Sequence, residues 1–339
     1  MKEIGFAVVG CGAIGAVHGE AICALPGAKL RAVFDKDPGR AQALAEKLGC
    51  EAYSDYDALL TREDIDVVSV CVPSGLHRDV VVPAARAGKH VICEKPLDTA
   101  LDRALEMERV CRENGVRLFP VVQNRFNPDI CLLRDAVREG KLGKIYWGSA
   151  HVILYRDDAY YTSGGWRGSP TLDGGVLLNQ GIHFIDLMVS LLGKPVSVMG
   201  KSASRREGFE AEDVSVGCVT FESGAIGTIE GTTDAAPGLY SELCIYAEKG
   251  SVIFRNDRLL LVTVPDVPEL SKRVDETALY TREQTAKVTP EGHLRQYTDI
   301  LAAIREGREA QVTAADAIET LRVILALKES SGTGREVKL

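Results

Sequence analysis

The sequence predicts an α/β protein with a doubly wound parallel sheet, followed by an α+β domain with an antiparallel sheet. Three observations predict this class. A glycine-rich turn separates an apolar run from a helical pattern near the N-terminus, strand-like and helix-like segments alternate up to residue 122, and strand-like segments follow one another from about residue 144. Because 339 residues exceed what one core usually supports, we expect two domains, 1–122 and 123–339.

The glycine turn is the first element that points to a ligand. Gly10-Cys-Gly-Ala-Ile-Gly15 is a G-x-G-x-x-G motif placed after a strand pattern and before a helix pattern. In this context Gly10 permits the tight turn, Gly12 lets the backbone approach a pyrophosphate, and Gly15 lets the helix pack on the strand. The backbone N–H groups here, including those of Ala13 and Ile14, face an anion at the positive end of the helix dipole.

A second strand-like run, residues 29–34, ends in Asp35. A carboxylate about twenty residues beyond the glycine turn accepts both ribose hydroxyls of an adenosine. The alternative is an ordinary turn followed by an unrelated aspartate. Since Asp35 would repel a 2′-phosphate, we expect NAD as the cofactor, while Lys36 and Arg40 nearby keep NADP possible.

The remaining elements follow from periodicity and turn residues. In the first domain we expect helices at 38–48, 80–87 and 99–114 and strands at 4–9, 65–72, 89–93 and 116–122. Gly49 is the expected C-cap of the first of these helices. In the second domain we expect strands at 145–155, 196–202, 214–221, 225–232, 242–247, 251–254 and 259–264, a long surface loop at 265–290, and closing helices at 292–306 and 314–330.

Composition excludes several partners. A net charge of −8 argues against nucleic acid. The nine cysteines include no C-x-x-C pair and mostly lie in apolar runs, which is typical of reduced thiols in the cytoplasm. We find neither an export signal nor an apolar run long enough for a membrane span, so we expect a cytoplasmic protein that does not associate with membranes.

Lys95 follows the strand pattern at 89–93, at the carboxyl edge of the sheet where ligands of doubly wound folds gather. An ammonium group beside a nicotinamide can hydrogen-bond a substrate hydroxyl and stabilise the alkoxide as it forms. Once desolvated it can also exchange a proton. The alternative is a surface lysine at a strand end. Pro96 makes the loop rigid, and a cis Lys95–Pro96 bond is possible.

Residues 174–192 form an apolar helical segment with one polar stripe. Asn179, His183 and Asp186 recur at i, i+4 and i+7, so their side chains share a face of a buried helix. Burying polar groups costs on the order of 1–3 kcal/mol each unless they are hydrogen-bonded. The glycines in this segment also allow close approach of a ligand. We therefore favour an active site over a satisfied core histidine, with Asp186 in a structural role.

Other chemistries fit the sequence less well. The six histidines show no metal-ligand spacing, so we expect no metal. Serine hydrolysis would need a nucleophile elbow, which we do not find. Hydride transfer needs one acid–base group, one oxyanion stabiliser and correct placement. Lys95 and His183 would supply both groups.

Taken together, the glycine turn, Asp35, Glu94-Lys95-Pro96 and the glycine-rich helix with Asn179 and His183 resemble the glucose–fructose oxidoreductase / inositol dehydrogenase (Gfo/Idh/MocA) family. The resemblance spans nearly the whole chain. It implies an N-terminal Rossmann domain, a C-terminal domain with a large open-faced antiparallel sheet, and homodimers or homotetramers packed through that sheet. It also implies NAD(P)-dependent oxidation of a secondary hydroxyl on a sugar, polyol or nucleotide sugar.

By position, the resemblance implies that the glycine turn and Asp35 hold the adenosine half of the cofactor. It implies that the nicotinamide half is lined by Ser74, His77, Glu94, Lys95 and Gln123. Trp166 and Arg167 resemble a loop that covers the cofactor, but Arg167 can equally pair with a substrate phosphate or carboxylate. Without the family, this loop would be read as a surface turn.

One departure from the family pattern concerns residue 179. Inositol-dehydrogenase-like members carry Asp four residues before the histidine, whereas this chain has Asn179. An amide cannot take a proton, but it can hold the substrate or the histidine by hydrogen bonds. We expect His183 to accept the alcohol proton while Lys95 stabilises the oxygen, and the reverse assignment stays open.

Two other functions use the same scaffold: a glycosidase that oxidises its substrate transiently with bound NAD, and a non-catalytic NAD(P)-binding sensor. The chain contains both Lys95 and His183, and a sensor would not need both, so we consider the sensor the weaker alternative. An aromatic and basic run suits stacking on a sugar face, although a solvated loop with packed aromatics is an equal alternative. The run consists of Tyr155, Arg156, Tyr160, Tyr161, Trp166 and Arg167. We expect His293, on the helix predicted at 292–306, to reach the same substrate cleft as this run.

Overall fold

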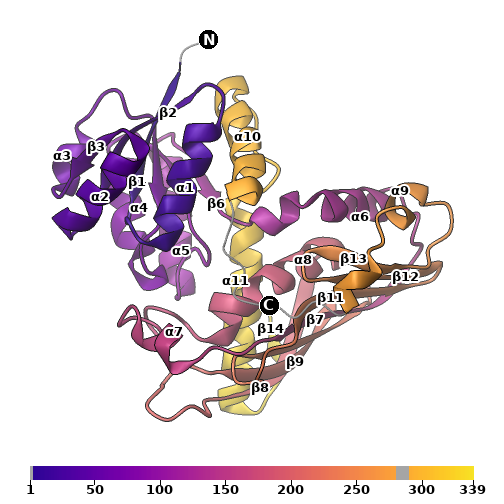
Figure 1. The fold of residues 1–339 in the computed structure, drawn as a ribbon. Coiled ribbons are helices and arrows are strands. Elements are labelled where there is room, and N and C mark those ends of the chain that lie inside the picture. Colours follow the sequence, from indigo (N-terminus) through magenta and orange to yellow (C-terminus); the bar gives the residue numbers. More distant parts are fainter. Residues whose placement is uncertain (1–2, 280–289) are drawn as a thin grey trace. The chain divides into compact units, whose positions relative to one another are not determined.

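The computed structural model describes residues 3–279 and 290–339. These residues form two compact units, one of 3–123 with 290–318 and the other of 124–279 with 319–339 (Figure 1). The first crossing between the units lies next to the boundary that the sequence predicts. The later return of residues 290–318 to the first unit is not part of that prediction.

The first unit contains a six-stranded, wholly parallel sheet in the order β3-β2-β1-β4-β5-β6, which confirms the doubly wound sheet. Its strands are β1 Ile4–Val9, β2 Ala28–Phe34, β3 Glu51–Tyr53, β4 Val67–Val70, β5 His90–Cys93 and β6 Leu118–Pro120. The strand order reverses between β1 and β4, and ligands of such sheets bind at the carboxyl ends of the strands on either side of that point.

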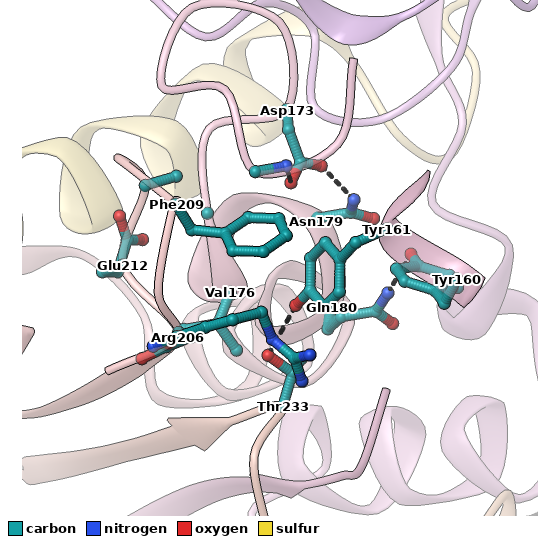
Figure 2. A pocket seen from close by; sticks show the side chains of 14 residues that line it. Tyr160, Tyr161, Asp173, Val176, Asn179, Gln180, Arg206, Phe209, Glu212 and Thr233 are labelled. Carbon is teal, nitrogen blue, oxygen red and sulfur yellow. Dashed lines mark hydrogen bonds between the residues drawn. The ribbon is translucent and has the colours of Figure 1, made fainter. Parts of the chain in front are cut away.

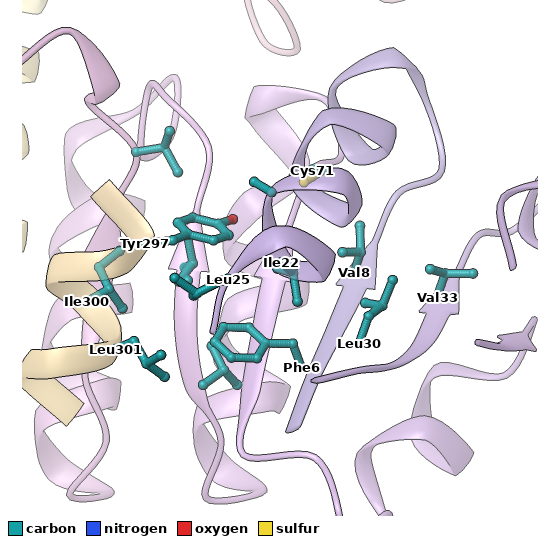
Figure 3. Packing of buried hydrophobic residues seen from close by; sticks show 14 of the residues in the cluster. Phe6, Val8, Ile22, Leu25, Leu30, Val33, Cys71, Tyr297, Ile300 and Leu301 are labelled. Atoms are coloured by element: carbon teal, nitrogen blue, oxygen red, sulfur yellow. The ribbon is translucent and has the colours of Figure 1, made fainter. Parts of the chain in front are cut away.

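The helices of the first unit are α1 Ala13–Ala24, α2 Pro38–Leu48, α3 Tyr56–Leu60, α4 His77–Arg86, α5 Leu101–Glu113 and α10 Pro290–Glu306. Helix α10 packs against α1, and its Tyr297 enters the same apolar cluster as Phe6 and Ile22 (Figure 3). Helix α2 begins where Asp37 accepts the N–H groups of residues 39 and 40, and it ends at Gly49, whose φ of 70° confirms the predicted cap.

The second unit contains an eight-stranded sheet in the order β13-β12-β11-β7-β10-β9-β8-β14. Its strands are β7 Ile145–Ile153, β8 Pro195–Ala203, β9 Val214–Phe221, β10 Ile226–Thr232, β11 Tyr240–Ala247, β12 Gly250–Arg255, β13 Arg258–Val262 and β14 Val337–Lys338. The sheet is mixed rather than wholly antiparallel as expected, because β7 and β10 pair in parallel. These two strands are neighbours in space but not in sequence, since helices and the β8–β9 hairpin separate them.

The helices of the second unit are α6 Pro128–Arg138, α7 Asp158–Thr162, α8 Ile182–Leu192 and α9 Pro268–Ser271, while α11 Ala314–Thr333 continues into it from the first unit. Helix α8 packs on β7 and β11. Cross-strand partners on the other face of the sheet include Trp147 and Ile226, which are 41% and 53% exposed. That face is therefore open in the single chain.

The segment 265–290, expected to be a long loop, contains α9 and a short 3-10 turn at Glu276–Leu279, and its residues 280–289 lie outside the described part. Among the described residues, no helix has both the length and the apolar character that crossing a membrane requires.

Candidate functional site

The glycine turn has the geometry that dinucleotide binding requires. Gly10 has a φ of 102°, and a Cβ there would meet the Cys71 carbonyl oxygen at 2.6 Å. A Cβ on Gly15 would meet the Gly10 carbonyl oxygen at 1.9 Å, so only glycine lets α1 lie this close to the strand. A Cβ on Gly12 would meet nothing within 4 Å. Gly12 is also the N-cap of α1 and provides no side-chain cap, so the first N–H groups of the helix fit an anion.

Asp35 lies directly against this turn. Its Oδ2 accepts the backbone N–H of Cys11 at 2.8 Å, and its Oδ1 accepts the backbone N–H of Asp37 at 2.9 Å. The carboxylate is thereby fixed beside the glycine turn, which is the position required for a ribose contact. Burial and the nearby Asp35 raise the pKa of the Cys11 thiol to about 12. Lys36 and Arg40 follow at the start of α2, where Arg40 Nε lies 3.5 Å from Asp37 Oδ2.

The loop after β4 is tied to the loop after β5 by His77. Its Nε2 lies 3.0 Å from the Val72 carbonyl oxygen, and its Nδ1 lies 2.9 Å from the Pro96 carbonyl oxygen. Burial lowers the pKa of this imidazole. The Lys95–Pro96 peptide bond is cis, as the sequence suggested. Ser74 is buried in the short 3-10 helix Ser74–Leu76 of the same loop.

Glu94 directly follows the last residue of β5. It is buried, with 6% of its surface exposed. Its Oε1 lies 2.9 Å from His18 Nε2 and 3.5 Å from His293 Nε2, and its Oε2 accepts the backbone N–H of Lys95 at 3.0 Å. Burial acts to raise the pKa of Glu94, but the hydrogen bond with His18 and the adjacent His293 ring hold it well below its usual value. The carboxyl group is therefore ionised.

His18 connects this carboxylate to a second polar pair. Its Nδ1 lies 2.7 Å from the Tyr297 hydroxyl and 2.8 Å from the Ser69 hydroxyl. Burial lowers the pKa of His18, so the ring is neutral; it donates from Nε2 to Glu94 and accepts at Nδ1 from a hydroxyl. No sequence pattern indicated a role for His18, Ser69 or Tyr297. The position of His18, three residues after Gly15 on the helix that begins at the glycine turn, is the one signal that could have done so.

Gln123 is the last residue of the first unit before the chain enters the second. Its Oε1 is buried and has no hydrogen-bond partner among the described residues. An unpaired buried acceptor fits a donor from a ligand, such as the amide group of a nicotinamide.

Among residues 3–279 and 290–339, two groups of side chains that could bind a metal have their ligand atoms within 4.8 Å of one another. One is His18, Glu94 and His293, and the other is His151, Glu242 and Cys244. In the first, both nitrogens of His18 already take part in hydrogen bonds. In the second, Arg255 Nε pairs with Glu242 at 2.5 Å and burial raises the pKa of the Cys244 thiol to about 11, which disfavours a thiolate ligand.

In the second unit the predicted polar stripe begins on a π-helical turn. The π-helix Leu177–Gly181 carries Asn179 and continues into α8, which carries His183 and Asp186. Such turns are frequent at functional sites. Asp186 forms a two-pronged ion pair with Arg125 at 2.6 and 2.7 Å and accepts the Thr320 hydroxyl at 3.0 Å. These contacts agree with its expected structural role.

Asn179 is held by a carboxylate that the sequence analysis did not identify. Its Nδ2 donates to Oδ1 of Asp173, whose Oδ2 accepts the Gly168 backbone N–H at 2.9 Å. Gln180 donates to the Tyr160 hydroxyl at 2.8 Å, and the Tyr161 hydroxyl lies 2.7 Å from that of Thr233. These groups surround a pocket (Figure 2). Its lining consists of Tyr160, Tyr161, Gly168, Asp173, Gly175, Val176, Asn179, Gln180, Arg206, Phe209, Ala211, Glu212, Asp213 and Thr233.

The lining of the pocket includes charged groups of both signs. The Arg206 guanidinium lies 4.8 Å from the centroid of the Tyr161 ring and pairs with Asp234 at 2.7 Å. Glu212 pairs through Oε2 with Lys328 at 3.2 Å, and its buried Oε1 has no hydrogen-bond partner among the described residues. Burial raises the pKa of this carboxyl group.

Trp166 and Arg167 form a packed loop in the second unit. The Arg167 guanidinium carbon lies 4.6 Å from the Trp166 ring centroid and 4.4 Å from that of Tyr160, and Nη1 donates to the Ser163 hydroxyl at 3.0 Å. These contacts join residues of the loop to one another, as in the alternative of a solvated loop with packed aromatics, and stacking on a sugar stays a prediction. Lys95 belongs to the first unit and His183 to the second, so their convergence on one substrate stays a prediction.

Comparison with known proteins assigns both halves of the chain. Residues 4–121 match a family described as an oxidoreductase family with an NAD-binding Rossmann fold. Residues 134–339 match the C-terminal alpha/beta domain of the same oxidoreductase family.

The chain is similar over nearly its full length to two proteins of known name. It is 30% identical to the myo-inositol 2-dehydrogenase of Thermotoga maritima, over 98% of this chain and 97% of that protein. It also resembles the WlbA dehydrogenase of Bordetella pertussis, crystallised with NADH and UDP-GlcNAcA, with a TM-score of 0.92 and 31% identity over 100% of this chain and 98% of the other.

Proposed function

The chain belongs to the Gfo/Idh/MocA family of NAD-binding oxidoreductases, and on that premise we propose that it oxidises a secondary ring hydroxyl of a nucleotide-linked sugar with NAD. The observation that carries the proposal is the position of Lys95. It leaves β5 at the same sheet edge as the glycine turn after β1, on the other side of the point where the strand order reverses. A cation there is suited to stabilising an alkoxide beside a nicotinamide.

The proposal gives the residues the following roles. NAD, when bound, would supply the hydride acceptor. The glycine turn and Asp35 would hold its adenosine half, and Ser74, His77 and Gln123 would line the nicotinamide side. Lys95 donates a hydrogen bond to the substrate oxygen, and His183 accepts the hydroxyl proton. Asn179, held by Asp173, orients the sugar or the histidine.

A nucleotide-linked sugar is preferred over a free sugar or polyol for two reasons. The WlbA relative was crystallised with a nucleotide-sugar acid. The second unit also gathers the guanidinium groups of Arg156 and Arg167 over the Tyr160 ring, at 5.5 and 4.4 Å from its centroid. Cations and aromatic rings at one place suit a ligand that has both sugar faces and anionic groups.

The proposal also includes assembly of the chain with copies of itself through the open face of the second-unit sheet. Large apolar side chains on that face, Trp147, Met199, Val216 and Ile226, are 41–53% exposed. Covering them would remove apolar surface from water. Light scattering should report a dimer or tetramer, and Ile226→Lys should dissociate it.

A cofactor-reduction screen tests the proposed activity. NAD and NADP would each be offered with nucleotide sugars, nucleotide-sugar acids, inositols and free sugars. We expect reduced NAD to form with a nucleotide sugar. Product formation without reduced cofactor would instead indicate transient oxidation, as in an NAD-dependent glycosidase. Tight NAD binding without any product would indicate a sensor.

A further inference from the structure

A chain of buried hydrogen bonds runs from the cofactor helix to the backbone of Lys95. His18 lies on α1, one turn beyond the glycine motif, and is wholly buried. Its Nε2 lies 2.9 Å from Glu94 Oε1, and the other oxygen of that carboxylate accepts the Lys95 backbone N–H at 3.0 Å. Helix α1 and the loop that carries Lys95 are therefore connected by one carboxylate.

The surroundings of Glu94 hold the carboxylate in one place. His293 from α10 adds a second imidazole, 3.5 Å from the same oxygen, and the Tyr297 hydroxyl on α10 reaches the far nitrogen of His18 at 2.7 Å. Two helices, α1 and α10, thus converge inside the first unit on Glu94, which directly follows β5. A side chain fixed by that many partners has little rotational freedom.

Fold stability does not require an ionised group at this position, even though the partners of Glu94 stabilise its charged form. A buried carboxylate loses its hydration, and well-packed apolar residues of similar volume often stabilise a core as well or better. The polar cluster instead contacts the backbone of Lys95, the residue whose position matters most for the proposed reaction. Rigid support of this kind is what a reactive side chain requires to stay within about 0.5 Å of a productive position.

We propose that Glu94 is a positioning residue for Lys95, and that His18 fixes the position of Glu94 relative to α1, the helix that begins at the glycine turn. The inference rests on the proposed function, in which Lys95 stabilises the alkoxide. It assigns Glu94 to support of the lysine, whereas the family resemblance implies that Glu94 lines the cofactor.

The test compares Glu94→Leu, Glu94→Gln and a matched control, Lys89→Met. Leucine removes the acceptor for the Lys95 amide, while glutamine keeps an oxygen that can accept it. Lys89 is buried in the same unit, and its ammonium group donates to the carbonyl oxygens of Arg62 and Ile65 near the amino ends of β4 and β5. Its loss should lower the unfolding midpoint without touching Lys95.

The first readout is hydrogen exchange of the Lys95 amide in the cofactor-free protein. We expect Glu94→Leu to speed this exchange by at least about tenfold, as loss of a hydrogen bond implies. Glu94→Gln should recover most of the protection, and Lys89→Met should leave it unchanged. Equal protection in wild type and Glu94→Leu would overturn the inference, whatever the activity.

The second readout separates turnover from binding. Glu94→Leu should lower kcat by at least about tenfold, the order expected for a misplaced reactive group, while the Kd for NAD stays within about twofold of wild type. A weaker NAD affinity at unchanged kcat would assign Glu94 to the cofactor and overturn the positioning role. If wild type oxidises no sugar but the exchange results are as expected, the inference stands and the proposed function fails.

Discussion

The side-chain amide of Asn179 donates a hydrogen bond to Asp173, a buried carboxylate that also accepts the backbone N–H of Gly168. The contact fixes which way the amide points. It also places a carboxylate beside the helical position where the family resemblance implies an aspartate. Asn179 is therefore a hydrogen-bonding group whose orientation is set by the loop that precedes the helix.

Replacing Asn179 by Asp should impair this protein even though it restores the family's residue. Two carboxylates would face each other in a buried setting, and one would have to stay protonated. We expect the free energy of unfolding to fall by about 1–3 kcal/mol and kcat to decrease. Thermal unfolding and steady-state rates measure this, with Asn114→Asp at the exposed end of α5 as the control. Equal or faster turnover in Asn179→Asp would show that the amide has no such role.

Lys95→Met should lower kcat/KM by about 10² to 10³, because the variant keeps the length of the side chain but cannot donate to the forming alkoxide. The Kd for NAD, measured by fluorescence titration, should stay close to that of wild type. Lys89→Met, the same substitution at a buried lysine near the opposite ends of the strands, should keep normal turnover. A Lys95→Met variant with wild-type kcat/KM would exclude the lysine from the chemistry.

His183→Asn should change the pH dependence of turnover. A protonated imidazole cannot accept the alcohol proton, so the wild-type rate of oxidation should fall at acid pH. The variant should lose this limb of the profile and turn over about 10² to 10⁴ times more slowly. If the limb persists in His183→Asn and disappears in Lys95→Met, the lysine carries the proton, as in the reverse assignment.

Asp35→Ala should shift the cofactor preference. The substitution removes a carboxylate fixed beside the glycine turn by Cys11 N–H, and with it both a ribose acceptor and the repulsion of a 2′-phosphate. We expect the ratio of kcat/KM for NAD to that for NADP to fall by at least about tenfold, or roughly 1.4 kcal/mol. Initial rates with each cofactor give this ratio. An unchanged ratio would place the ribose elsewhere.

The buried histidine–carboxylate cluster should make the first unit sensitive to acid. Burial lowers the pKa of His18 in the folded protein from 6.5. As the pH falls below about 6.5, His18 therefore binds a proton in the unfolded chain but not in the folded one, and the folded state loses stability. Glu94 acts in the same direction at lower pH. Burial acts to raise its folded pKa, but the histidines hold it well below 4.5, so its contribution is present above 4.5 and lost below.

The measurement is the thermal unfolding midpoint between pH 7.5 and 5. It should fall, because His18 contributes up to about 1.4 kcal/mol of unfolding free energy per pH unit. His18→Leu should flatten the dependence. A midpoint that rises on acidification would mean that His18 gains a proton on folding.

The sequence predicts best what depends on neighbouring residues. The glycine turn, the Gly49 cap and the structural role of Asp186 are local patterns, and the structure agrees with each of them. Helix α6 could also have been predicted, since Asn127 before Pro128 is an N-cap signal and its side chain does accept the Asp129 N–H.

The sequence predicts poorly what depends on distant segments. His18 and His293 meet at Glu94 only because α10 returns to the first unit and packs on α1. The parallel pairing of β7 with β10 likewise depends on the path of the chain through helices and a hairpin. No periodicity along the chain encodes either contact.

Isotope transfer tests the central claim most directly. A sugar active in the screen would be prepared with deuterium on the carbon that bears the reacting hydroxyl, and the reduced cofactor would be weighed by mass spectrometry. Direct hydride transfer predicts one deuterium in every molecule of reduced NAD formed. Reduced cofactor without deuterium, or product that forms while the cofactor stays oxidised, would contradict the account.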